Sequence, residues 1–126
     1  MTDAAKAWTA GHLPWITIGL LCLWLPPVID AVAFNRRWTD PAEVMTVAEL
    51  IAMFAALPGL LRREVVGWKR LCASRVMVLA HTSWMVLLNS RLDGVVPTLL
   101  TKPIVEAVLG LCLSFYVLAE VRGQYR

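Results

Sequence analysis

Five ionisable residues lie inside long apolar stretches of this chain: Asp30, Glu49, His81, Lys102 and Glu106. An ionisable side chain at membrane depth is costly unless it is paired or hydrated, so it usually faces the interior of a helical bundle and marks a functional site. Carboxylates and an imidazole in that setting relay protons, bind ions or fix the register of packed helices. We predict that these five residues form one intramembrane polar network.

More than one pairing of charged residues is possible within this network. Lys102 and Glu106 are four residues apart, which places them on the same face of a helix. The lysine also suits Asp30 or Glu49 as a partner on another helix. A network that holds the bundle together and a proton, ion or ligand site that opens outward both remain compatible with this pattern.

His81 is the candidate cofactor ligand of the chain. Met77 and Met85 lie one turn to either side of it, a set of donors that Cu(I) would accept. Methionine at helical spacing more often fills gaps in packing, so we predict no metal. A haem or (bacterio)chlorophyll needs only one axial imidazole, which His81 supplies. His12 precedes the first apolar stretch, at the opposite membrane interface, and would not complete a two-histidine haem site.

Catalytic signatures are absent from the sequence. It contains no GxSxG, HExxH, phosphate-binding loop or paired-carboxylate pattern. Cys22, Cys72 and Cys112 form no CxxC pair and are interpreted as packed, reduced thiols. We therefore expect a protein that is not an enzyme and has no catalytic residues.

Composition identifies the membrane as the solvent of this protein. Hydrophobic residues make up 59% of the 126 positions and charged residues 17%, and the mean hydropathy is +0.65. These values depart from those of soluble proteins. The net charge of +3 comes from basic residues in short connections rather than on one face, which argues against nucleic acid as a partner. Residues 1–126 are expected to form a single integral membrane domain.

The elements that must position the polar residues are four apolar stretches, at about 15–34, 44–61, 71–89 and 98–118. At about 1.5 Å per residue, each approaches the ~30 Å hydrocarbon core of a bilayer as a helix. Short connections make successive helices antiparallel neighbours. The sequence therefore predicts an all-α membrane protein with an up-down-up-down bundle of four transmembrane helices.

Local signals refine these helices. Pro26 and Pro27 are expected to bend or break the first, whereas Asp40 and Pro41 resemble the capped start of the second. Residues 3–13 are expected to form a short interfacial helix, which Thr2 caps. Small residues recur four apart in the second helix and favour close packing against a neighbour; these are Ala48, Ala52, Ala56, Ala55 and Gly59.

The distribution of lysine and arginine predicts the orientation. With both termini inside, eight basic residues lie on the cytoplasmic side and three outside, and Lys102 is left out as intramembrane. Arg75 is counted inside, because its side chain can reach back to the headgroups. Both termini are therefore predicted to be cytoplasmic. The five polar residues then lie in the outer half of the bundle, at depths of about 6 to 13 Å from the outer boundary of the membrane.

Four helices in so short a chain leave little room for a catalytic domain or a transport pathway. We expect a small noncatalytic subunit of a larger, energy-transducing membrane complex, with the lipid bilayer and other integral membrane subunits as its partners. One alternative is a homo-oligomeric transporter or channel that uses the intramembrane carboxylates. Another is a haem-binding or pigment-binding redox or light-harvesting accessory subunit that uses His81. The expected location is a bacterial inner membrane, crossed several times.

Overall fold

The chain folds into four long helices, which confirms the all-α prediction. The computed structural model describes residues 1–34, 40–93 and 98–126, and the side chains of residues 1–34, 40–87 and 105–126. The helices are α1 (Asp3–Ile29), α2 (Pro41–Leu61), α3 (Val65–Asp93) and α4 (Thr98–Glu120). A π-helix, η1 (Asp30–Phe34), continues α1, and a 3-10 turn, η2 (Arg122–Gln124), follows α4. The described residues contain no strand.

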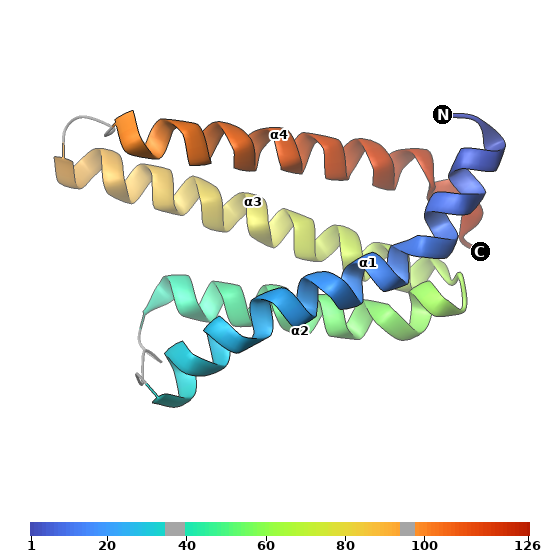
Figure 1. Ribbon diagram of the computed structural model, residues 1–126, viewed down its shortest axis with the longest axis horizontal. Helices are drawn as coiled ribbons and strands as arrows, with labels where there is room; N and C mark the ends of the chain where they lie inside the picture. The colour runs from blue at the N-terminus through green and yellow to red at the C-terminus, as the bar shows by residue number, and fades with distance from the viewer. Residues whose placement is uncertain (35–39, 94–97) are drawn as a thin grey trace.

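Each helix runs antiparallel to the next. The N-terminus, the C-terminus and the turn between α2 and α3 therefore lie at one end of the molecule, here called the termini end (Figure 1). Helix α1 packs on α2, α2 packs most extensively on α3, and α3 packs on α4. Helices α1 and α4 approach each other at the termini end and diverge toward the opposite end, which is here called the open end (Figure 1).

Side-chain caps set the start of two helices. The hydroxyl of Thr2 accepts a hydrogen bond from the Ala5 amide at 3.2 Å, and the carboxylate of Asp40 accepts one from the Ala42 amide at 3.0 Å. Pro41 occupies the first turn of α2, where its missing N–H costs nothing. Both capping residues agree with the sequence analysis. The expected interfacial helix at residues 3–13 is not a separate element, because α1 runs through it without interruption.

The proline pair in α1 does not break the helix. Pro26 and Pro27 both lie inside it, and the amide of Asp30 donates to the carbonyls of both. The following five residues then adopt the wider π-helical turn of η1. A π-turn is one of the few ways in which a helix absorbs a local defect in its hydrogen bonding.

The core is largest at the termini end, where all four helices contribute to it. Its buried residues are Ala10, Leu13, Ala56, Leu60, Leu71, Leu118, Val121 and Tyr125. A second cluster, Leu21, Val28, Leu50 and Met53, joins only α1 and α2. Polar contacts reinforce the first cluster, since the indole N–H of Trp68 donates to the Leu118 carbonyl at 2.8 Å. Glu120 lies 3.5 Å from both the Lys6 ammonium and the N-terminal amine.

Two helical segments are long and apolar enough to cross a membrane, by length and composition among the described residues. They are Asp3–Phe34 and Pro41–Leu61, with mean hydropathies of 1.9 and 2.0 over their most apolar 18-residue windows. The remaining helices, α3 and α4, do not meet the same criterion within the part of the chain that is described.

Candidate functional site

The two central helices approach each other closely at a pair of glycines. A Cβ atom on Gly59 of α2 would lie 2.5 Å from both Cα and N of Gly67 in α3, which is far inside van der Waals contact. Only glycine permits this approach of the two backbones. The crossing holds the end of α2 against the start of α3, and the two helices pack along each other from there.

Glu49 and His81 meet across this contact. The Glu49 Oε1 lies 3.1 Å from the Nδ1 of His81, and the side chains are only 13% and 23% exposed, respectively. Glu49 lies about 15 Å along α2 from the crossing, and His81 about 21 Å along α3, at the ~1.5 Å rise of a helix. The length of the two side chains closes this difference. A neutral imidazole donates an ordinary hydrogen bond here, and a protonated one forms a charge-assisted pair.

Arg75 adds a second basic group to the same contact. Its Nη2 donates to the sulfur of Met53 at 3.4 Å, and its Nε donates to the hydroxyl of Ser74 at 3.3 Å. Ser74 is itself fully buried. Arg75 and Glu49 also attract each other electrostatically. Although an arginine at this depth can reach back to the lipid headgroups, Arg75 extends across to α2 and places its charge inside the helix assembly.

The other predicted network residues are placed as follows. Asp30 is exposed in η1, and Glu106 is exposed on α4. The side chain of Lys102 lies outside the described residues, so its expected pairing with Glu106, Asp30 or Glu49 stays a prediction. A hydrogen bond joins two of the predicted residues, Glu49 and His81.

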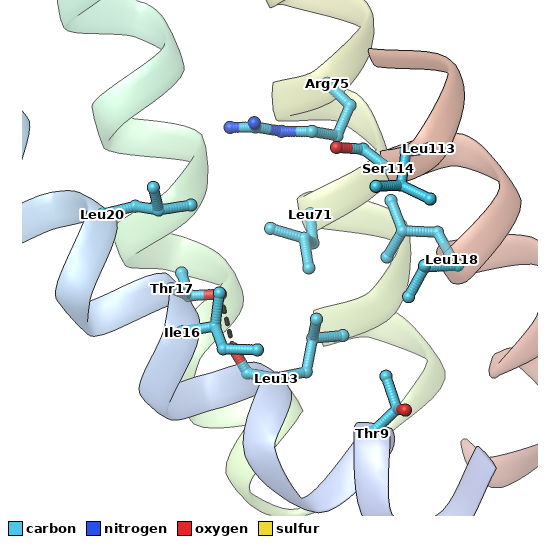
Figure 2. A pocket seen from close by; sticks show the side chains of 11 residues that line it. Thr9, Leu13, Ile16, Thr17, Leu20, Leu71, Arg75, Leu113, Ser114 and Leu118 are labelled. Carbon is cyan, nitrogen blue, oxygen red and sulfur yellow. Dashed lines mark hydrogen bonds between the residues drawn. The ribbon is translucent and has the colours of Figure 1, made fainter. Parts of the chain in front are cut away.

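A cavity of about 220 Å³ adjoins this site at the termini end; residues of α1, α3 and α4 line it, and it is partly open to the surface. Figure 2 shows Leu71 at its centre, with Leu13 and Thr17 of α1 on one side and Leu118 of α4 on the other. Its wall is almost entirely apolar. Arg75 forms part of this wall, so the same guanidinium borders both the cavity and the contact with α2 (Figure 2).

The hydroxyl groups of the cavity are already used as donors by their own helices. Thr9, Thr17 and Ser114 each donate to the carbonyl four residues earlier, at 2.7 to 2.8 Å. Figure 2 draws this bond between Thr17 and Leu13. Bonds of this kind satisfy polar side chains inside an apolar environment. They leave the hydroxyl oxygens able only to accept further hydrogen bonds.

The geometry defines how His81 would hold a cofactor. Its Nδ1 faces Glu49, so a ligand bond to a haem or pigment would come from Nε2, with the carboxylate orienting the ring. Met77 and Met85 are both exposed at 37%. The described residues contain no group of three or more His, Cys, Asp or Glu side chains that could hold a metal ion. Cys22, Cys72 and Cys112 are all free thiols.

No protein-family model, curated protein or solved structure matches this chain.

Proposed function

We propose that this protein crosses a bilayer four times and acts as a noncatalytic subunit of a larger, energy-transducing membrane assembly. The observation that carries the proposal is the apolar outer surface. Among the described residues, 24 large hydrophobic side chains are exposed, against 13 hydrophobic residues that are buried. A protein surrounded by water rarely exposes apolar side chains on this scale, whereas a protein in lipid needs them.

Helices α1 and α2 support this proposal through their low burial. Only 17% and 28% of their most apolar windows are buried inside the molecule. The core helix of a soluble protein would be mostly buried, so that explanation does not fit. A signal sequence would not explain α2, which lies in the middle of the chain.

Helices α3 and α4 are less apolar overall, but the positions of their polar groups fit a membrane. Arg75 and His81 of α3 turn toward α2, while the exposed surface of α3 carries large apolar residues such as Leu79 and Trp84. The exposed surface of α4 includes Leu109 and Leu113, each at 63%. Lipid would therefore meet apolar side chains on all four helices, which supports four spans rather than two.

The distribution of basic residues supports an orientation with both termini in the cytoplasm. The termini end carries the arginines of the α2–α3 turn and of the C-terminal segment (Figure 1). Cytoplasmic segments of membrane proteins carry such an excess.

The open end of the bundle supports a role as a subunit. Toward that end, α4 packs on α3 but diverges from α1 (Figure 1). The exposed apolar residues Val105, Val108 and Leu109 of α4 lie in the half of the helix nearer this end. Helices of a partner membrane protein could complete the bundle there.

Isolation in a mild detergent followed by native mass spectrometry tests this proposal. We expect the chain to leave the membrane together with larger integral membrane proteins. A pure small homo-oligomer under the same conditions would contradict the subunit role. An absorption spectrum of the isolate also tests His81 as a cofactor ligand, since a visible band should disappear in His81→Ala while it persists in His12→Ala.

The Glu49–His81 pair favours a second candidate function, proton-coupled transport by a homo-oligomer. An imidazole and a carboxylate joined by a hydrogen bond can pass a proton between them, which proton-coupled transport requires. In this candidate Glu49→Gln abolishes coupled flux in proteoliposomes, and Glu43→Gln in the first turn of α2 retains it. Equal flux in wild type and Glu49→Gln would exclude this mechanism.

A further inference from the structure

We propose that the termini end holds the phosphate of an anionic phospholipid in a cavity between the α2–α3 turn and the C-terminal segment. The cavity measures about 420 Å³ and is lined by Arg62, Arg63, Glu64, Gly123, Gln124 and Arg126. This inference rests on the proposed membrane insertion, since it needs a headgroup layer at this end of the molecule.

Charge is the first argument for an anionic ligand. Three arginine side chains, one glutamate side chain and the α-carboxylate of Arg126 line the cavity, which leaves an excess of one positive charge. The ion pair between Arg62 and Glu64 spans 4.0 Å, and its side chains are 75% and 49% exposed. Such an exposed pair is weak, so Arg62 can still bind an anion. Arginine presents a planar fork of N–H donors that matches phosphate oxygens.

The cavity is held in shape by the backbone. The Arg126 amide donates to the Arg63 carbonyl, and the Val65 amide donates to the Arg126 carbonyl, both at 2.9 Å. These two bonds fasten the C-terminal segment to the α2–α3 turn. Arginines far apart in the sequence are thereby brought to one site.

Arg63 occupies a backbone position that normally favours glycine. Its φ is 55°, and the amides of Arg63 and Glu64 donate to the carbonyls of Leu60 and Gly59, respectively. These bonds form a Schellman motif, in which the left-handed residue is usually glycine. An arginine at this position costs folding stability, and such a departure points to a use for its side chain.

The surroundings of the cavity fit a lipid better than a free phosphate ion. Leu61 and Val66 flank the turn and are 57% and 50% exposed, which provides apolar surface for acyl chains beside the charged cavity. In the proposed orientation this end faces the cytoplasmic leaflet, where anionic lipids attract basic residues.

Native mass spectrometry of the detergent-solubilised full chain with added lipid tests this site. The probes are phosphatidylglycerol and phosphatidylcholine with identical acyl chains. We expect preferential retention of phosphatidylglycerol by the wild type, and about fivefold weaker retention by Arg63→Gly and by Arg126→Gln. Lys69→Gln is the matched control, because it removes one charge close to the same turn but outside the cavity. Arg63→Gly should keep the fold, since glycine suits the backbone conformation.

Three outcomes would overturn the lipid site. One is equal retention of the two lipids by the wild type. Another is an equal loss in Lys69→Gln, which would indicate diffuse surface charge. The third is displacement of phosphatidylglycerol by millimolar inorganic phosphate, which would indicate a free-anion site. Alkaline extraction of membranes tests insertion separately: a chain that stays in the pellet but shows no lipid preference contradicts this site alone.

Discussion

Replacement of Gly67 by alanine should separate the two central helices. The added Cβ would overlap the backbone of Gly59 and Leu60, and no flexible side chain lies there to give way. The reciprocal substitution at Gly59 places a Cβ 2.5 Å from the Gly67 backbone, whereas carbon atoms in contact are about 3.5 to 4.0 Å apart. The helices must therefore move apart by about 1 Å.

The expected cost follows from this displacement. Overpacking of a tight contact destabilises a protein by about 1 to 3 kcal/mol, and a clash between two backbones belongs at the upper end of that range. Gly110→Ala is the matched control, because a Cβ on Gly110 meets nothing within 4 Å. That variant should gain up to about 1 kcal/mol from helix propensity. Gly67 also lies inside a helix and gains the same propensity, so the two variants should differ by the cost of overpacking alone, about 2 to 3 kcal/mol in the free energy of unfolding.

Reversible unfolding in mixed micelles of increasing SDS fraction, followed by tryptophan fluorescence, measures this difference. Gly67→Ala should unfold at a markedly lower SDS fraction than wild type, and Gly110→Ala at an equal or higher one. Gly59→Ala should behave like Gly67→Ala, because both substitutions fill the same crossing. Equal midpoints for Gly67→Ala and Gly110→Ala would refute the close approach of α2 and α3.

Two further substitutions test the core at the termini end. Trp68→Phe removes the hydrogen bond to Leu118 and the contact of the indole with the Arg122 guanidinium, which lies 5.2 Å from the ring centroid. The free energy of unfolding should fall by about 1 to 2 kcal/mol in the same titration. The control Trp24→Phe, at an exposed position, should change it by almost nothing. Tyr125→Phe should stabilise the fold or leave it unchanged, because the Tyr125 hydroxyl is buried without a hydrogen-bond partner among the described residues. Burial raises the pKa of this hydroxyl, although Arg63 opposes the shift, so folding disfavours its ionisation. The wild type should then lose stability as the pH rises above about 10, and Tyr125→Phe should lose less. A loss of more than 1 kcal/mol at neutral pH in Tyr125→Phe would argue against an unpartnered hydroxyl.

The existence of the helices and the capped starts of α1 and α2 could be predicted from the sequence because these features are local. Thr2 and Asp40 cap the first turns that follow them, as their positions suggest. The start of α3 could not be predicted, because the basic residues up to residue 70 are typical of a connection between two membrane helices. The α2–α3 turn needs only three residues, so α3 begins at Val65 and includes Gly67. The sequence therefore revealed Gly59 as one side of a close contact but not the residue opposite.

The partners of the polar residues could not be predicted, because they depend on how each helix is rotated about its axis. The depths estimated from the sequence put all five polar residues in the same part of the membrane. They therefore could not distinguish His81 from Lys102 as the partner of Glu49. The direction of the Arg75 side chain could not be predicted for the same reason. Its position in α3 allows it to reach the headgroups, but it donates a hydrogen bond to Met53 of α2 instead.

Cysteine accessibility on sealed membrane vesicles of known orientation tests the four-span account most directly. In a variant without Cys22, Cys72 and Cys112, single cysteines are introduced at Thr39, Glu64, Val95 and Gln124, one in each connection and one after α4. A membrane-impermeant maleimide should label positions 39 and 95 from the outer side, and positions 64 and 124 only from the cytoplasmic side. Labelling of position 95 from the same side as positions 64 and 124 would show that only α1 and α2 cross the membrane, and would contradict the account.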